Sequence, residues 1–384
     1  MQRLGFLFVT LLGISALSTQ AEVKSQHNPL LPGVHVLALL PPGPGNPRNS
    51  EGSFIRLKDG RILFAYSKFL GSVGSDDAPA MIAGRYSSDG GRSWAAVDTP
   101  IVERSGSMNV MSVSLLRLQD GRIALFYVRK DSISDAHIYV RYSSDETRTW
   151  SAPTLCIHDR GYYVLNNDRV IQLHTGRLVV PVALQSSVDG RFDSRGQAMT
   201  YLSDDAGATW HRSHDILVCP TPSRAGFQEP GVVELRDGRV MMFIRTALGS
   251  QYISYSKDGG EHWSTAQPSS IQSPLSPASI KRIPSTGDLL LVWNDHSKIN
   301  PLFRASEHSF GKRTPLSVAV SKDDGRTWIH VHDILEDPNG CYCYVAIAFV
   351  NNRILLGFSS TGKGLACLSQ IELIDFPIRS IEKN

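Results

Sequence analysis

Short stretches of alternating apolar and polar residues run along the chain, separated by turns rich in glycine, aspartate and asparagine. Residues 138–142 (Ile-Tyr-Val-Arg-Tyr) and 316–320 (Leu-Ser-Val-Ala-Val) are two examples. An alternation with a period of two residues is typical of β-strands. No helical periodicity of useful length follows the first 21 residues. The pattern therefore predicts an all-β protein.

A turn of the Asp-Gly type recurs between two apolar runs. In the first instance, residues 55–61 read Ile-Arg-Leu-Lys-Asp-Gly-Arg. Related segments follow at 116–122, 172–177, 233–239, 283–288 and 349–353. Because two strands joined by such a turn form a β-hairpin, we expect six hairpins.

A second motif, Ser-x-Asp-x-Gly-x-Thr/Ser-Trp, follows five of these hairpins. It begins at Ser87, Ser143, Ser203, Ser256 and Ser321, at spacings of 56, 60, 53 and 65 residues. Asp and Gly can build a tight turn, and Trp can pack that turn onto a sheet, so the motif has a structural purpose that needs no function. Thr147 replaces the glycine of the second copy, and His262 replaces the threonine of the fourth.

Six hairpins and five such turns predict six units of four strands each. Four-stranded sheets repeated around a channel form a β-propeller, so we expect a six-bladed β-propeller. The sixth unit lacks the turn motif, and we expect residues 33–40 to complete it. In this fold the innermost strands converge on the axis, so the residues that open each hairpin should meet at one end of the channel.

The first 21 residues predict a signal peptide. They carry one charge at Arg3, an apolar run over residues 4–17 and a small residue, Ala21, at the expected cleavage point. An uncleaved anchor is the alternative, although the run is shorter than the ~20 residues of a membrane span. We expect residues 22–384 to form one domain that is secreted or periplasmic.

The charge and cysteine content narrow the functional classes. The net charge of +3 is spread along the chain, so no basic patch indicates nucleic-acid binding. Five cysteines without a Cys-x-x-Cys spacing fit neither a dense disulfide framework nor a zinc site, and we expect no metal or other cofactor. Cys341 and Cys343 should lie on one strand face as small buried residues, with an isolated disulfide as the alternative.

The five turn motifs, which are Asp boxes, on a six-bladed plan resemble the sialidase (neuraminidase) superfamily of BNR/Asp-box repeat proteins. The resemblance covers nearly all of residues 22–384. It implies a retaining exo-α-sialidase-like glycoside hydrolase that removes terminal sialic acid, or a related 2-keto sugar acid, from glycans. Sialylated or other acidic glycans are the implied partners.

Residues 227–245 carry the most specific part of the resemblance. They are similar to the sialidase segment in which a glutamate opens the fourth blade and an arginine ends its second strand, which implies that Glu229 is a catalytic base and that Arg245 binds the substrate carboxylate. Arg313 precedes the strand that enters the fifth Asp box and resembles a second carboxylate-binding arginine. Arg304 is the alternative for this position.

Residues 341–347 resemble the strand that brings a tyrosine nucleophile to the axis. We expect Tyr342 to be this nucleophile because its distance from Val345 and Ile347 fits the pattern better. Tyr344, which shares its face of the strand, is the alternative. The tyrosine that is not catalytic should pack in the channel wall.

The first blade matches the family less well. Sialidases open it with Arg-Ile-Pro, whereas residues 47–53 read Pro-Arg-Asn-Ser-Glu-Gly-Ser. Arg48 is the candidate third arginine, about two residues from the simplest register, and Glu51 is a nearby acid without a part in the family pattern. Asp76, with Asp77 as the alternative, is the expected catalytic acid on the following loop.

Residues 166–169 open the third blade and should point toward the axis. Asp168 and Arg169 could contact a sugar or tie the turn, and the sequence favours neither.

These residues suit a substrate that carries a carboxylate on its anomeric carbon. Arginines bind carboxylates through rigid forked donors. A tyrosine nucleophile avoids the charge repulsion that a carboxylate would meet there, and a paired glutamate can take the phenol proton. Two other classes stay open: a propeller glycosidase of different specificity, and a noncatalytic carbohydrate-binding propeller.

Overall fold

The alternating segments of the sequence form strands in the computed structural model, which describes residues 29–188, 191–298, 312–361 and 364–382. The expected signal peptide over residues 1–21 and the candidate Arg304 lie outside the described residues. The prediction of an all-β protein is confirmed, since the single helical element is the short 3₁₀ turn Ile378–Ile381 within the described residues.

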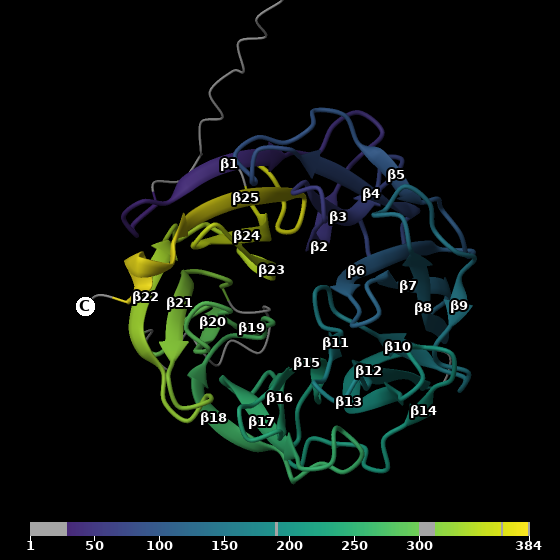
Figure 1. The fold of residues 1–384 in the computed structure, drawn as a ribbon. Helices are drawn as coiled ribbons and strands as arrows, with labels where there is room; N and C mark the ends of the chain where they lie inside the picture. Colours follow the sequence, from purple (N-terminus) through teal and green to yellow (C-terminus); the bar gives the residue numbers. More distant parts are fainter. Residues whose placement is uncertain (1–28, 189–190, 299–311, 362–363, 383–384) are drawn as a thin grey trace, which may run out of the picture.

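The strands form sheets that stand in a ring around a central axis, as in a β-propeller (Figure 1). Four sheets of the described chain have four strands each. They consist of β2 (Asn49–Arg56), β3 (Ile62–Phe69), β4 (Ala80–Ser87) and β5 (Thr99–Val102); β15 (Gln228–Glu234), β16 (Val240–Arg245), β17 (Ser250–Ser256) and β18 (Gln267–Gln272); β19 (Ser279–Arg282), β20 (Leu289–Trp293), β21 (Leu316–Ser321) and β22 (Ile329–Leu335); and β1 (His35–Leu40), β25 (Gln370–Pro377), β24 (Arg353–Ser360) and β23 (Cys343–Val350).

A fifth sheet has nine strands and contains two successive groups. The first group is β6 (Asn109–Arg117), β7 (Ile123–Ser132), β8 (Asp135–Ser143) and β9 (Thr154–Leu155), and the second is β10 (Tyr162–Val164), β11 (Ile171–Gln172), β12 (Leu178–Val188), β13 (Arg191–Ser203) and β14 (His211–Arg212). The two groups are joined where β10 pairs in parallel with β8, through Tyr162 and Ala136.

The six predicted hairpins all form, as β2–β3, β6–β7, β11–β12, β15–β16, β19–β20 and β23–β24. Their first strands lie nearest the centre of the ring (Figure 1). The expected closure near the N-terminus is also confirmed, because β1 pairs antiparallel with β25 beside the last hairpin. Across the described residues, no helix has both the length and the apolar character needed to cross a membrane.

The five Asp boxes form tight turns directly after the strand that follows a hairpin, as the sequence predicts. In the first, the Ser87 hydroxyl oxygen accepts the Gly91 N–H at 2.9 Å, and the Asp89 carboxylate accepts the Ser93 N–H at 2.9 Å. The two altered boxes keep this geometry. Thr147 adopts the left-handed φ of 70° that the usual glycine would take, and the His262 ring replaces the threonine hydroxyl on Asp258 at 2.8 Å.

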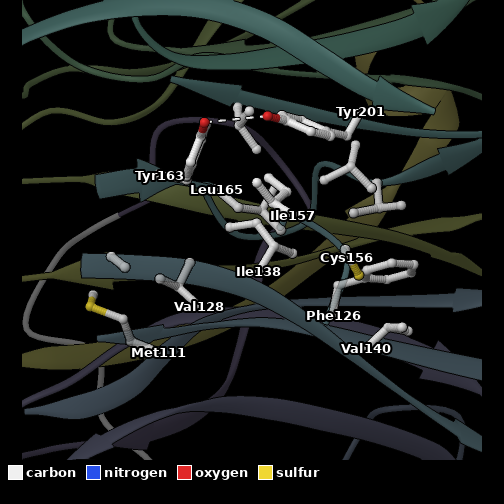
Figure 2. Packing of buried hydrophobic residues seen from close by; sticks show 14 of the residues in the cluster. Met111, Phe126, Val128, Ile138, Val140, Cys156, Ile157, Tyr163, Leu165 and Tyr201 are labelled. Carbon is white, nitrogen blue, oxygen red and sulfur yellow. Dashed lines mark hydrogen bonds between the residues drawn. The ribbon is translucent and has the colours of Figure 1, made fainter. Parts of the chain in front are cut away.

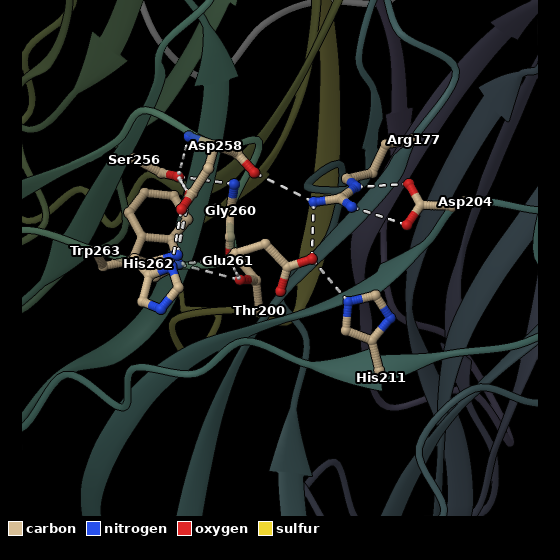
Figure 3. Close-up of polar contacts among 10 residues, drawn as sticks. All are labelled: Arg177, Thr200, Asp204, His211, Ser256, Asp258, Gly260, Glu261, His262 and Trp263. Carbon is tan, nitrogen blue, oxygen red and sulfur yellow. Dashed lines mark hydrogen bonds and ion pairs between the residues drawn. The ribbon is translucent and has the colours of Figure 1, made fainter.

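The Asp box of β17 also binds the neighbouring group of strands (Figure 3). Trp263 donates its indole N–H to the Thr200 hydroxyl at 3.1 Å. Arg177 donates to the Asp258 carbonyl at 3.2 Å and pairs with Glu261 at 3.0 Å. This box therefore fastens its sheet to the adjacent group of strands.

Apolar side chains fill the space between adjacent groups of strands. The largest cluster lies between β6–β9 and β10–β14 and includes Phe126, Ile138, Leu165, Tyr163 and Tyr201 (Figure 2). Tyr201 donates its hydroxyl hydrogen to Asp159 Oδ2 at 2.6 Å, and its oxygen lies 3.3 Å from the Tyr163 hydroxyl, which satisfies polar groups beside this apolar region. The packing fixes β10, whose residues also line a cavity.

Candidate active site

A cavity of about 710 Å³ is lined by residues from the strands that meet near the axis. Its polar part contains Glu51, Asp76, Glu229, Arg245 and Tyr344. Its apolar part rests on the cluster of Figure 2, from which Met111, Val128, Tyr163 and Leu165 reach its wall. The volume is ample for a sugar residue with its substituents.

A repeated backbone feature points side chains into this cavity. Glu51, Ser112, Glu229 and Tyr344 all lie near the start of an inner strand and have positive φ values of 55°, 60°, 43° and 56°. The strand register shifts at each of these places. A bulge of this kind redirects a side chain, and left-handed backbone in a residue other than glycine costs ~1–3 kcal/mol. All four residues line the cavity.

The bulges of β15 and β23 bring a tyrosine and a glutamate together. Tyr344 donates its hydroxyl hydrogen to Glu229 Oε1 at 3.1 Å. Arg245, at the end of β16, pairs with Glu229 Oε2 at 2.5 Å. Burial, and then the charge of Glu229, raise the pKa of the Tyr344 phenol, while Arg245 and Arg313 act in the opposite direction. The phenol thus lies beside a carboxylate that can take its proton.

Arg313 lies over the ring of Tyr344. Its guanidinium carbon is 5.5 Å from the centre of the Tyr344 ring, and its Nη1 donates to the Cys343 sulfur at 3.0 Å. Arg313 and Arg245 both line the cavity. The tyrosine is therefore flanked by two permanently charged, forked donors of the type that binds a carboxylate.

The bulge of β2 places Glu51 in the cavity and Arg48 behind it. Arg48 Nη1 pairs with Asp76 Oδ1 at 2.5 Å, and its Nη2 is 3.7 Å from Glu51 Oε1. The guanidinium also lies over the Phe69 ring, 4.4 Å from its centre. Ser112, from the bulge of β6, donates to Glu51 Oε2 at 3.3 Å.

Asp168 binds groups from several sheets at the axis. Its carboxylate accepts hydrogen bonds from the Ser53 hydroxyl at 2.8 Å and the Ile347 N–H at 2.9 Å, and it pairs with Lys281 at 2.7 Å. The adjacent Asn167 donates to the carbonyls of Gly52 and Tyr344. This segment therefore closes the channel and holds two of the cavity bulges in place.

Comparison with known proteins places the chain in a family. Residues 97–356 match the family described as the BNR repeat-like domain. The chain belongs to the BNR repeat-like family. This membership confirms the resemblance to the sialidase superfamily that the Asp boxes indicate.

Curated relatives include two sialidases. One from Bacteroides fragilis is 26% identical over 232 residues, which is 57% of this chain and 38% of that protein. One from Micromonospora viridifaciens is 27% identical over 302 residues, which is 70% of this chain and 43% of that protein. The chain thus spans about two fifths of the length of these relatives.

Solved structures share the fold. A Dyadobacter fermentans protein of unknown function has a TM-score of 0.70 at 19% identity, covering 90% of this chain and all of that one. Trypanosoma rangeli sialidase, solved with 2,3-difluorosialic acid as a covalent intermediate, has a TM-score of 0.68 at 13% identity, covering 92% of this chain and 60% of that one. At these identities the similarity shows a common sialidase-like propeller fold.

One tyrosine prediction from the family pattern is wrong. Tyr342 is fully buried, packs with Phe358 and Ile374, and is not among the described residues that line the cavity. The bulge between Cys343 and Ala346 breaks the strand alternation on which the preference for Tyr342 depended. Of these two tyrosines of β23 and its preceding turn, Tyr344, the alternative, is the one that lines the cavity of this BNR repeat-like protein.

The expected third arginine of the family pattern also has a different position. Arg48 is buried against Phe69 and paired with Asp76, and it is absent from the described lining of the cavity. The structure gives no support for a substrate contact by Arg48. The residue that the β2 bulge turns into the cavity is Glu51. Asp76 and Asp77 both line the cavity.

Neither Asp168 nor Arg169 reaches the cavity lining. Asp168 makes the axial contacts above, and Arg169 donates to the Ala278 carbonyl at 2.6 Å and lies over the Phe243 ring. Burial lowers the pKa of Arg169 to about 10. The sequence left open whether Asp168 and Arg169 contact a sugar or tie the turn, and these contacts fit a structural role. Asn166 is the residue of this segment that lines the cavity.

The cysteines also differ from the favoured expectation. Cys341 forms a disulfide with Cys367, so it is not a simple buried thiol. Cys343 is a free thiol whose sulfur accepts the hydrogen bond from Arg313. The isolated disulfide, which the sequence left as an alternative, lies in the cavity wall.

Sequence reasoning missed several polar cavity residues, among them Ser112 and Lys130. Lys130 is buried on β7, and its ammonium donates to the Asp76 carbonyl at 3.1 Å and lies over the Tyr162 ring. No local pattern singles it out. Ser112 has a usable signal, because Glu51, Ser112 and Glu229 each lie nine residues before the glycine of their hairpin turn.

Proposed function

We propose that this chain is a retaining glycoside hydrolase of the exo-α-sialidase type, which removes a terminal sialic acid or a related 2-keto sugar acid. The contact between Tyr344 and Glu229, with Arg245 on the far side of the carboxylate, carries this proposal. A tyrosine paired with a base suits a substrate whose anomeric carbon bears a negative charge. The sialidase relatives support the same reaction class.

In the first step the Tyr344 oxygen forms a bond to the anomeric carbon as its proton passes to Glu229. The glycosidic bond breaks at the same carbon, and the leaving oxygen takes a proton from a carboxyl group of the cavity. In the second step water attacks the anomeric carbon and the bond to Tyr344 breaks. The phenolate regains its proton from Glu229, and the proton of the water returns to the carboxylate that acted as acid.

Arg245 and Arg313 would bind the substrate carboxylate. Each charge-assisted hydrogen bond contributes roughly 1.5–3 kcal/mol, so two forked donors suffice to orient a sugar acid beside Tyr344. Acidic glycans are accordingly the proposed partners, and the residues named here require no metal or other cofactor.

The nine-stranded sheet bears on the proposed blade number. Each of its two groups contains a hairpin and an Asp box. The groups are joined only where one residue of β8 pairs with one residue of β10. Counting the groups separately gives the proposed six-bladed propeller, with residues 22–384 as one domain.

We also propose that the protein is exported to the periplasm or the medium. The apolar run over residues 4–17 and the small residue at Ala21 support a cleaved signal peptide. The Cys341–Cys367 disulfide agrees with an oxidising compartment.

The β2 bulge favours one alternative within the same reaction class. Glu51 lines the cavity while Arg48 is paired with Asp76 behind it, so the arginine clamp has two members in place of the expected three. A sugar acid other than the common sialic acids would be compatible with this difference.

The test is release of 4-methylumbelliferone from its α-sialoside by the purified protein and by two tyrosine variants. Tyr344→Phe should lower kcat by more than about 10³-fold, because it removes the nucleophile. Tyr342→Phe is the matched control and should keep the wild-type kcat. Full activity in Tyr344→Phe would overturn the proposed mechanism, and an inert wild type would direct the same assay to glycosides of other sugar acids.

A further inference from the structure

Glu51 has the same backbone setting as the two residues proposed to carry out the chemistry. Its φ is 55°, compared with 43° for Glu229 and 56° for Tyr344. A bulge near the start of an inner strand turns each of the three side chains into the cavity. A strained backbone of this kind persists where the surrounding structure holds it for a purpose. The carboxyl group of Glu51 therefore requires an explanation of its own.

Two carboxyl groups lie on either side of one guanidinium. Arg48 Nη1 is 2.5 Å from Asp76 Oδ1, which is a direct ion pair, whereas Nη2 is 3.7 Å from Glu51 Oε1, beyond hydrogen-bond length. Arg48 therefore makes a direct hydrogen-bonded ion pair with Asp76, whereas it acts on Glu51 through its charge alone. The hydrogen bond that Glu51 receives comes from the neutral Ser112 hydroxyl at 3.3 Å.

The two acids consequently differ in their readiness to carry a proton. Burial raises the pKa of Glu51 to about 7, against the opposing charge of Arg48. Desolvation would also raise the pKa of Asp76, although its side chain is 65% exposed, but the charges of Arg48 and Lys130 and the hydrogen bond from Arg48 outweigh it and leave that pKa lowered. Near neutral pH, Asp76 is ionised while Glu51 holds a proton for much of the time. Paired acids whose environments separate their pKa values indicate which is the proton donor.

We propose that Glu51 is the catalytic acid of this site, donating its proton to the oxygen of the leaving group. Asp76, which the family pattern assigns to this role, instead holds Arg48 in place and is a positioning residue. This inference rests on the proposed function, because it concerns the proton required when the glycosidic bond breaks.

The proton transfers balance with this assignment. As the Tyr344 oxygen bonds to the anomeric carbon, the leaving oxygen takes the Glu51 proton and Glu51 becomes a carboxylate. In the second step this carboxylate takes a proton from the attacking water, and the hydroxyl group bonds to the anomeric carbon. Glu51 is then protonated again for the next cycle.

The charged groups around Glu51 come from every element packed against it. Arg48 and Lys130 are cationic and favour the ionised form of Glu51, while Asp76 and Glu229 are anionic and favour the protonated form. Tyr344 also interacts with Glu51, and the charge of Glu51 opposes ionisation of the phenol. Loss of the Glu51 proton therefore makes the nucleophile harder to activate, so both effects lower the rate as the pH rises above about 7.

The experiment compares two substrates with different leaving groups, 4-methylumbelliferyl α-sialoside and sialyllactose. An aryl leaving group departs with little help from an acid, whereas a sugar hydroxyl needs the proton. Glu51→Gln should lower kcat/KM for sialyllactose by about 10²–10⁴-fold and leave the aryl substrate far less affected. Asp76→Asn, the matched control, should affect both substrates to a similar extent.

The pH profile and a second variant complete the test. The fall in the wild-type rate above about pH 7 should disappear for Glu51→Gln acting on the aryl substrate. Glu51→Asp, which keeps an acid, should regain part of the sialyllactose activity, and the thermal unfolding midpoint of each variant shows whether it is folded. A leaving-group effect in Asp76→Asn and none in Glu51→Gln would overturn the assignment. The wild-type rate on the aryl substrate tests the proposed function separately, since it does not depend on which carboxyl group is the acid.

Discussion

At the scale of single residues, the cavity depends on close contacts beside its bulges. Glycines follow the two inward-facing glutamates, as Gly52 after Glu51 and as Gly231 two positions after Glu229. A Cβ atom on Gly231 would lie 2.2 Å from Phe243 Cζ, and one on Gly52 would lie 2.2 Å from Phe64 Cζ. Any larger residue would push the inner strand away from the aromatic ring that supports it.

Gly231→Ala should therefore destabilise the protein by about 1–3 kcal/mol, the usual cost of overpacking a filled core. Urea unfolding measures this loss. Gly43→Ala is the matched control, because a Cβ atom at Gly43 would meet nothing within 4 Å. Equal unfolding midpoints for the two variants would contradict the close packing described here.

The residues of the site differ in how far the sequence could predict them. Glu229 and Arg245 lie in a segment with a specific family pattern, so their positions follow from it. Tyr344 was only the alternative, because a β-bulge cannot be read from apolar alternation and shifts every side chain beyond it. Lys130 lies near the end of an ordinary buried strand, and its place beside Asp76 depends on the packing of two sheets.

At the scale of elements, an Asp box has two roles. Its own hydrogen bonds hold a tight turn, and its side chains can bind the neighbouring group of strands, as in the box of β17. The carboxylate of each box accepts backbone and side-chain hydrogen bonds, as Asp323 does from Thr327 at 2.9 Å and 2.7 Å. These bonds lower the pKa of Asp323 to about 2 even though partial burial opposes them. Because hairpins and boxes are local in sequence, all of them could be predicted from the pattern alone.

The lowered box pKa values predict acid sensitivity. A carboxyl group whose pKa is lower in the folded state stabilises the protein above its unfolded pKa of ~3.9, and that stability is lost as the pH falls through the folded value. The thermal midpoint should therefore decline from about pH 4 toward pH 2.

Asp323→Asn provides the matched control, because the amide resembles the protonated acid. Its thermal midpoint should lie below that of the wild type at pH 7, and the difference should shrink as the pH approaches 2. A difference that stays constant from pH 7 to pH 2 would show that the Asp323 charge contributes nothing to the stability of the box.

At the scale of the whole molecule, the ring of sheets places distant residues around one cavity. Tyr344 and Glu229 are 115 positions apart in sequence, yet their side chains form a hydrogen bond. Asp168 joins β2, β19 and β23 at the axis, and Asn167 holds the carbonyl of Tyr344. The proposed catalytic arrangement thus depends on the closed ring.

The ring of sheets could be predicted from the sequence, but not every residue that lines the cavity. Repeats and hairpins specify the sheets and the closure near the N-terminus. Which residue of each inner strand faces the cavity depends on the bulges, and the pairing of Cys341 with Cys367 depends on two segments meeting in space. That Glu51 lines the cavity and Arg48 does not also depends on a bulge, the one in β2.

The central claim is that Tyr344 forms a covalent bond with the substrate. The protein should be incubated with 2,3-difluorosialic acid and examined by intact mass and peptide mapping, with Tyr344→Phe alongside. We expect one glycosyl group attached to the peptide that contains Tyr344 in the wild type and none in the variant. Attachment of the sugar to Glu229, or equal labelling of the Tyr344→Phe variant, would contradict this account.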